Sequence, residues 1–314
     1  MAVSSFRTGL KTLSLLAGNP ATALGVAGYV AGGTNGPPLA NVEKYLFATE
    51  TTTTLAAEFT TALGFVGGMS NPSVAGYTLG GDLDTGGAND YVDTVHKYAF
   101  PDDTRTTLAT GLSAGLRGVA GFSDPSVAGY AAGGNNNAQG QTDSVDKFSF
   151  PSDTRTSTTT LSNSVRFLAT FSDPSVAGYA AGGGVADVDK FAFPTDSRTT
   201  LATGLSITRD GAAGFSDPGV AGYAAGGRNS DTDVVDKFSF PTDSRTTLAT
   251  GLSSTTYFAA AFAQPQVAGY VAGGDDGAPT TLSKVDKFTF PTDTRSSGTS
   301  LSTPRTTAGP LQDA

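Results

Sequence analysis

The chain repeats one unit six times, and this repetition constrains the fold more than any other feature of the sequence. The string Gly-Tyr-x-x-Gly-Gly occurs six times in 314 residues, at intervals of 44–53 residues. A repeat of this length is typical of solenoids, propellers and related arrays, in which each repeat is one supersecondary unit. The tyrosines of the six strings are Tyr29, Tyr77, Tyr130, Tyr179, Tyr223 and Tyr270.

Each unit contains four stretches with strand character, as the unit that starts at Arg117 shows. A first strand is predicted over 118–122, and an Asp-Pro-Ser turn leads to a second strand over 127–132. A third strand over 145–150 alternates polar and aromatic residues and ends at a proline. The Thr-rich run after Arg155 suits a fourth strand, because β-branched residues favour strands. No stretch shows a helical period with caps, so we expect almost no helix.

These units predict an all-β fold, a six-bladed β-propeller with four antiparallel strands per blade in one domain that spans 1–314. An open β-solenoid is the alternative, although four antiparallel strands per repeat are unusual for it. The 41 glycines fit a propeller, because small residues on the inner strands let neighbouring sheets approach closely while aromatic residues fill the wider outer wedge.

A double glycine ends the second strand of every unit, where we expect a backbone conformation or a close approach that only glycine tolerates. These structural glycines are Gly32, Gly33, Gly80, Gly81, Gly133, Gly134, Gly182, Gly183, Gly226, Gly227, Gly273 and Gly274.

The two ends of the chain both carry sequence like that of a first strand. Residues 304–309 resemble the start of another unit, and residues 13–18 precede an Asn-Pro turn as a first strand would. We therefore expect the ends to overlap and close the ring through a shared blade, which removes free sheet edges. Residues 1–12 are expected to lie partly outside the ring, as an arm or a closing strand.

Composition excludes several classes of function. The chain has no Cys and a single His, so disulfides, Cys-ligated metals and His-based catalytic relays are excluded. That residue, His96, replaces an Asp found in four other units and indicates drift rather than catalysis. The net charge of −9 argues against nucleic-acid binding. No apolar run is long enough for a membrane helix, and residues 10–17 lack the sustained apolar core of a signal peptide.

The unit resembles the kelch repeat. The resemblance rests on the strand that ends in Gly133-Gly134, on the aromatic strand 147–151 that ends in proline, and on Arg117-Gly118 at the start of the first strand. It covers nearly the whole chain, but the tryptophan usual in kelch repeats is absent and Thr occupies that region. The near-identical Ala- and Thr-rich units resemble kelch-like proteins encoded by tailed bacteriophages. This resemblance implies a virion-associated protein.

Loops that differ between units are candidate binding elements, because variable loops on a fixed scaffold often carry binding. The loops between the second and third strands hold 4–13 residues, and they are rich in Asp, Asn and Gly. Drift in solvated turns explains the same composition. Calcium binding is a weaker alternative, because no loop fits the EF-hand pattern. The candidate loop residues are Asp82, Asp84, Asn135, Asn136, Asn137, Asp231, Asp233, Asp275 and Asp276.

The arginines form two sets. Arg105, Arg155, Arg198, Arg245 and Arg295 each follow an Asp by two positions at the turn before the fourth strand, and we expect them to stabilise that turn by pairing with the Asp. The second set is expected at the mouth of the axis, where it would hold an acidic peptide or an anionic glycan, or would bond to carbonyls of the neighbouring blade. It comprises Arg117, Arg166, Arg209 and Arg305.

Without a catalytic set, the sequence favours a structural and adhesive protein of a phage particle: a fibre, tail or decoration component located on the virion. Its expected partners are other virion proteins and a host-surface glycan, with a homo-oligomer left open and no cofactor expected. A soluble lectin-like protein with glycan sites between blades is the alternative. Some kelch-type enzymes oxidise sugars through copper held by Tyr-Cys and His, which this chain cannot supply, and a glycosidase with two loop Asp is least favoured.

Overall fold

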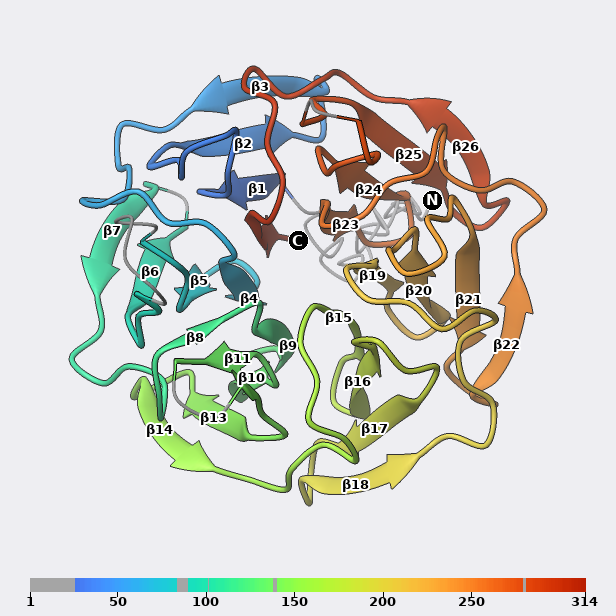
Figure 1. Cartoon of the computed structure of the whole chain (residues 1–314), viewed down its shortest axis with the longest axis horizontal. Helices are drawn as coiled ribbons and strands as arrows, with labels where there is room; N and C mark the ends of the chain where they lie inside the picture. Colours follow the sequence, from blue (N-terminus) through green and yellow to red (C-terminus); the bar gives the residue numbers. More distant parts are fainter. Residues whose placement is uncertain (1–25, 84–89, 101, 138–139, 279–280) are drawn as a thin grey trace, which may run out of the picture.

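The computed structural model describes residues 26–83, 90–100, 102–137, 140–278 and 281–314. Every regular element in these residues is a β-strand, which confirms the prediction of an all-β fold without helices. No helix in this part of the chain is therefore long and apolar enough to cross a membrane. The sheets are arranged around a central axis, so the fold is propeller-like (Figure 1).

The described residues form six four-stranded antiparallel sheets, one for each repeat, together with one three-stranded sheet. We number the four-stranded sheets 1 to 6 along the chain. The innermost strands are β27 (Gly309–Asp313), β4 (Gly67–Asn71), β9 (Ala120–Asp124), β15 (Leu168–Asp173), β19 (Ala213–Asp217) and β23 (Ala260–Gln264). The second strands are β1 (Ala27–Ala31), β5 (Ala75–Leu79), β10 (Ala128–Ala132), β16 (Ala177–Gly182), β20 (Ala221–Ala225) and β24 (Ala268–Ala272).

Two further strands complete each sheet toward the circumference. The third strands are β2 (Val42–Leu46), β6 (Val95–Ala99), β13 (Val145–Ser149), β17 (Val188–Ala192), β21 (Val235–Ser239) and β25 (Val285–Thr289). The outer, Thr-rich strands are β3 (Thr51–Thr54), β7 (Thr104–Thr107), β14 (Thr154–Ser157), β18 (Ser197–Thr200), β22 (Ser244–Thr247) and β26 (Thr294–Ser297). The small sheet contains β8 (Leu116–Arg117), β11 (Asn135–Asn136) and β12 (Gly140–Gln141).

The last strand of the chain joins the first sheet. β27 pairs antiparallel with β1, so it supplies the innermost strand that the N-terminal repeat lacks. Each innermost strand also contacts the next one, in the order β27, β4, β9, β15, β19, β23 and back to β27. The expectation that residues 304–309 lead into a first strand is thus confirmed, whereas 1–12 and 13–18 lie outside the described residues.

Glycine permits the close contact between sheets. A Cβ atom on Gly121 of β9 would lie 2.2 Å from the carbonyl oxygen of Gly68 in β4, the inner strand of the neighbouring sheet. At the end of β10, Gly133 and Gly134 have φ of 64° and 110°, in the region that favours glycine. Each of the other five double glycines also has positive φ at both residues, so the expectation for these positions is confirmed.

The strand boundaries differ slightly from the expected ones. In the unit that starts at Arg117, the predicted first strand is interrupted because Gly118 has φ of 62°, so β8 ends before it and β9 begins at Ala120. The fourth strand, β14, starts at Thr154 and includes Arg155 instead of following it.

Candidate functional site

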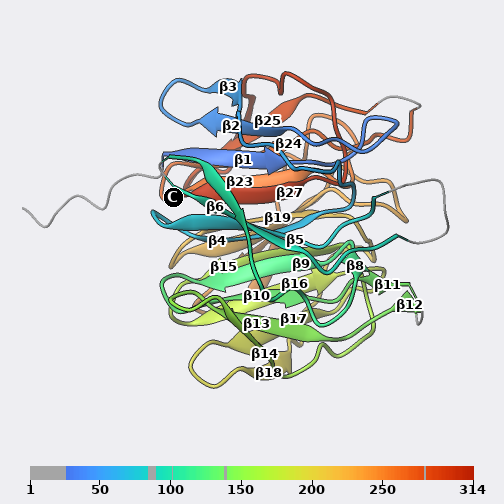
Figure 2. The ribbon, with the colours of Figure 1, turned by 90° about the vertical axis from the view of Figure 1, so that its left-hand side faces the viewer.

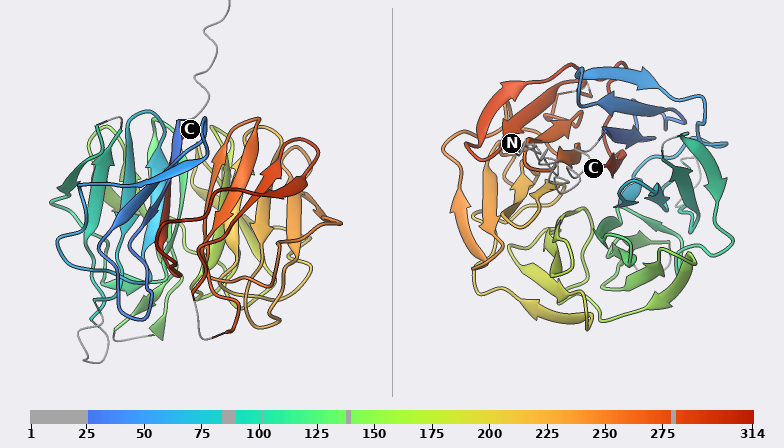
Figure 3. Two further views of the ribbon diagram at one scale, coloured as in Figure 1. Left: turned by 90° about the horizontal axis from the view of Figure 1, so that it is seen from above. Right: turned by 180° about the vertical axis from the view of Figure 1, so that it is seen from behind.

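The ring has two faces with different chemistry. The turn face carries the turns between the first and second strands, while the loop face carries the loops that follow the double glycines. Figure 2 places the C-terminus on the turn face and the β11–β12 hairpin on the loop face, and Figure 3 shows the ring from above and from behind. The turn face repeats one pattern, with exposed valines at Val26, Val74, Val127, Val176 and Val220.

An Asp in the turn before five of the six outer strands ties two sheets together. Asp196 of sheet 4 accepts a 2.7 Å hydrogen bond from the hydroxyl group of Tyr130 and forms a 2.7 Å ion pair with Lys147, both in sheet 3. The same arrangement recurs at Asp103, Asp153, Asp243 and Asp293. The repeated tyrosines and turn carboxylates are therefore structural.

The prediction that the arginine two residues after this Asp pairs with it is wrong. The side chain of Arg155 turns back along the sheet and forms a 3.2 Å ion pair with Asp146 of the adjacent third strand. The ion pairs Arg198–Asp189, Arg245–Asp236 and Arg295–Asp286 repeat this contact. The two residues are diagonal neighbours on adjacent strands, because Arg155 lies opposite Phe148 and Asp146 lies opposite Ser157. The turn Asp instead bonds to the neighbouring sheet.

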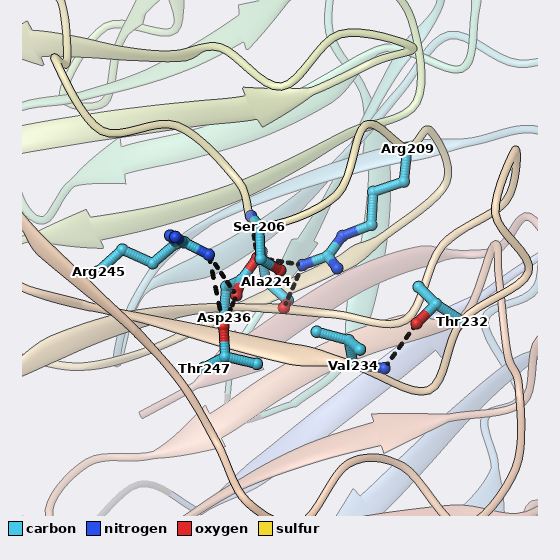
Figure 4. A network of polar contacts seen from close by, with 8 residues as sticks. All are labelled: Ser206, Arg209, Ala224, Thr232, Val234, Asp236, Arg245 and Thr247. Carbon is cyan, nitrogen blue, oxygen red and sulfur yellow. Dashed lines mark hydrogen bonds and ion pairs between the residues drawn. The ribbon is translucent and has the colours of Figure 1, made fainter.

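The carboxylate of Asp236 also anchors the loop that enters its sheet. It accepts hydrogen bonds of 2.8 Å from both the backbone N–H and the hydroxyl group of Ser206, while the hydroxyl group of Thr247 donates to its other oxygen at 2.8 Å. Figure 4 shows this network around the carboxylate. Equivalent Ser–Asp contacts hold the loops of sheets 3, 4 and 6. The serine belongs to a Leu-Ser string that follows five of the six Thr-rich strands in the sequence.

Arg209 and Arg305 do not lie at the mouth of the axis, so that prediction is wrong for both. Arg209 is fully buried in an ion pair with Asp236 (2.9 Å), and Arg305 is 1% exposed and paired with Glu43. Burial lowers the pKa of both guanidinium groups, although the carboxylates oppose the shift. Each precedes the start of the first strand by one residue more than Arg117 does, and a shift of one residue points a side chain to the opposite face of a strand.

His96 occupies the carboxylate position of sheet 2 and is buried. Its Nδ1 atom lies 3.1 Å from Nη1 of Arg105 and 3.0 Å from the hydroxyl oxygen of Thr107. Burial, aided by the Arg105 charge, lowers the pKa of His96 to about 4, so the ring is neutral at pH 7. Nδ1 accepts a hydrogen bond from the guanidinium group of Arg105. In this sheet a hydrogen bond to a neutral ring thus replaces the ion pair of sheets 3 to 6, which gives His96 a structural role.

Six residues encircle the axis on the loop face, immediately before the innermost strands, and all have φ between 55° and 66°. The N–H of each of five of them donates to the carbonyl oxygen of the equivalent residue one sheet earlier, at 2.7–2.9 Å. The N–H of Phe65 instead donates to the hydroxyl oxygen of Thr307 at 3.2 Å, which closes the ring. We call these residues the mouth ring: Phe65, Gly118, Phe167, Gly211, Phe258 and Thr307.

Large and small residues alternate in the mouth ring. A Cβ atom on Gly118 would lie 2.2 Å from the ring of Phe167, and one on Gly211 would lie 2.5 Å from the ring of Phe258. The phenyl rings of Phe167 and Phe258 thus each cover the glycine of the preceding sheet. The rings also contact one another, with centroids 5.9 Å apart for Phe65 and Phe167 and 4.7 Å for Phe167 and Phe258. Together they line an open cavity of about 90 Å³ in the channel.

A guanidinium group stacks on each of the three phenyl rings. Arg117 lies 5.0 Å from the centroid of Phe65, Arg166 lies 5.1 Å from that of Phe167, and Arg228 lies 4.8 Å from that of Phe258. Arg117 and Arg166 were predicted at the mouth and lie there. The three phenylalanines and Arg228 were not predicted, although an alignment of the six units at the residue before the first strand reveals the alternation of Phe with small residues.

The candidate loop residues divide between the mouth and the outer loops. Three of them directly follow the double glycines and form antiparallel β-bridges with the residues that precede the mouth ring. These three residues, Asp82, Asn135 and Asp275, therefore form the rim of the mouth ring. Asn136 pairs with Leu116 next to this rim. The other loop residues lie farther along their loops: Asn137, Asp231, Asp233 and Asp276. Asp84 lies outside the described residues.

Local hydrogen bonds account for several loop oxygens. The carboxylates of Asp275 and Asp276 accept from backbone N–H groups two residues ahead, at 2.8 and 3.0 Å, as Asx turns do. In the part of the chain that the structure describes, no group of three or more His, Asp or Glu side chains is placed to hold a metal ion. Calcium binding remains a prediction.

Comparison with known proteins does not assign the chain to a family. No protein-family model matches the chain, and no curated protein matches it either.

Proposed function

We propose that the chain is a non-enzymatic structural and adhesive protein of a bacteriophage particle, a fibre, tail or decoration component folded as a closed six-bladed kelch-like propeller. The six repeated four-stranded sheets and the pairing of β27 with β1 support the blade count and the closure. The resemblance of the Ala- and Thr-rich units to phage-encoded kelch-like proteins supports the particle.

One observation carries the proposal. The polar side chains that recur from repeat to repeat hold the sheets together, whereas the side chains that differ between repeats lie at the rim of one face. The tyrosines, turn aspartates and lysines bind sheet to sheet, and the acids of the third strands hold loops and arginines. Around the mouth ring, by contrast, each sheet presents different residues, among them Asp82, Asn135, Arg228 and Asp275. A constant scaffold with one varied rim suits binding better than turnover.

Purified particles of the phage that encodes the chain provide the test of the proposed location. Mass spectrometry of particles purified by density gradient should detect the chain at a copy number in a fixed ratio to the capsid protein. Its absence from such particles, when it is abundant in the infected-cell lysate, would contradict the proposed function. The proposed partners are other virion proteins and a glycan of the host surface.

A second candidate is a soluble lectin-like protein. The half-buried phenyl rings and the guanidinium groups of the mouth favour it, because aromatic faces and a few polar groups are what small-ligand sites combine. Strong binding of the isolated protein to a glycan array, together with absence from particles, would favour this candidate over the first.

A further inference from the structure

The rim of the mouth is uneven, and its most open sector lies at sheet 4. The loop between β16 and β17 is the shortest of the six, with only residues 184–187 between the double glycine and the third strand. Gly184, the first of them, is exposed, and no atom lies within 4 Å of the place where its Cβ would stand. This sector therefore has free space at Gly184, whose N–H donates to the carbonyl oxygen of Arg209, two residues before Gly211 of the mouth ring.

Arg166 lies in the repeat position that borders this sector, and it differs from the other two mouth arginines. Arg117 forms a 2.9 Å ion pair with Asp82, and Arg228 forms two hydrogen bonds of 3.1 and 3.2 Å with Asp210. Within the described residues Arg166 forms no ion pair, and its Nε atom, like that of Arg117, is buried without an acceptor. One of the three equivalent cations at the mouth thus lacks a carboxylate partner.

The surface beneath this cation is apolar and rigid. The guanidinium group of Arg166 is stacked over the ring of Phe167, which in turn contacts Phe258. Both phenylalanines have positive φ, a strained conformation for bulky residues that is found where the surrounding structure imposes it. Their backbones are held by the hydrogen-bonded mouth ring, so the phenyl faces are positioned in advance.

We propose that this sector binds the carboxylate of an acidic sugar at the end of a glycan. The planar guanidinium group of Arg166 would bind the two carboxylate oxygens, because its N–H groups match carboxylate geometry. Because guanidinium groups and glycines cover the faces of Phe167 and Phe258, the C–H groups of the pyranose would contact the ring edges that line the mouth cavity. The inference rests on the proposed adhesive function and names the ligand class of that site.

The test is a titration of the purified full-length chain at pH 7, followed by NMR, with the methyl glycosides of glucuronic acid and N-acetylneuraminic acid. Methyl glucoside provides the neutral sugar control, and benzoate provides the carboxylate without a sugar. The variant Arg166→Gln removes the proposed cation, while Arg155→Gln removes an equally half-buried arginine on the outer strand of sheet 3. Thermal melting verifies that both variants fold.

We expect saturable binding of at least one acidic glycoside, at least tenfold weaker in Arg166→Gln and unchanged in Arg155→Gln. The proposal is overturned by the absence of binding, by equal binding to Arg166→Gln, or by methyl glucoside or benzoate binding as tightly as the acidic sugars. If the chain is found in particles but fails this titration, the ligand assignment alone is wrong. If it binds acidic sugars but is absent from particles, the particle assignment alone is wrong.

Discussion

The hydroxyl group of Tyr130 donates a 2.7 Å hydrogen bond to the carboxylate of Asp196 on the next sheet. Lys147 lies 2.7 Å from the other oxygen of that carboxylate, so one turn residue receives two side chains of its neighbour. Burial and the carboxylate both raise the pKa of Tyr130 well above its usual value of 10, which keeps the hydroxyl group a donor. Because the pattern recurs around the ring, it defines how consecutive sheets are joined.

Replacing Asp196 by Asn tests this join. Asn adopts the positive φ of 53° found here almost as readily as Asp, so the change removes charge without straining the turn. Loss of the charge-assisted contacts should lower the free energy of unfolding by about 1–2 kcal/mol, measured by chemical denaturation. Asp102→Asn, at an exposed residue whose hydrogen bonds within the described residues go to Thr104, should change it by less than about 0.5 kcal/mol. Equal effects of the two variants would contradict the claim that Asp196 holds the two sheets together.

Gly118→Ala tests the alternation of the mouth ring. The new Cβ would meet the ring of Phe167 at 2.2 Å, in addition to the cost of φ at 62°. Gly140→Ala is a matched control, because Gly140 has φ of 82° with no atom within 4 Å of its Cβ position. We expect the control to lose about 1–2 kcal/mol from the left-handed conformation alone, and Gly118→Ala to lose at least 1 kcal/mol more, in the same denaturation assay. Similar losses would mean that Phe167 moves aside freely.

Much of the scaffold was predictable because its signals are local. Double glycines, proline turns and alternating third strands each act within a few residues, so the order of strands follows from them. The position of Arg209 was not predictable in this way. Asp210 separates Arg209 from the mouth ring, and a shift of one position along the chain decides whether a side chain points into the core or into the solvent. The pairing of Asp196 with Tyr130 joins different repeats, which no pattern inside one unit reveals. The mouth phenylalanines lie just outside the repeated strings.

The buried pair of Arg209 and Asp236 gives an asymmetric prediction. Two other sheets have Leu63 and Leu116 at the position of Arg209, so Arg209→Leu should change the free energy of unfolding by no more than about 1 kcal/mol. Asp236 would keep its contacts with Ser206, Thr247 and Arg245. Asp236→Ala leaves the buried cation with the carbonyl oxygen of Ala224 but without a counter-ion, and should cost about 3–5 kcal/mol. Thermal and urea unfolding compare the two, and the reverse order would contradict this account of the pair.

His96 should make the protein sensitive to mild acid. Its pKa in the folded chain, about 4, lies below the value of 6.5 in an unfolded chain, so the unfolded state binds the proton first. The contribution of His96 to the free energy of unfolding should therefore be fully present above pH 6.5. It should fall as the pH drops from 6.5 toward 4, by up to roughly 3 kcal/mol. His96→Asn, which does not titrate, should remove that part of the loss between pH 7 and 4.5. Parallel stability–pH curves for the two proteins would show that His96 is not the cause.

The central claim is that this repetitive ring is a component of a phage particle. The most direct measurement is quantitative mass spectrometry of gradient-purified particles, compared with the lysate from which they came. The account predicts that the chain is enriched in particles in a constant ratio to the capsid protein across independent preparations. Recovery of the chain only in the soluble fraction of the lysate would contradict it.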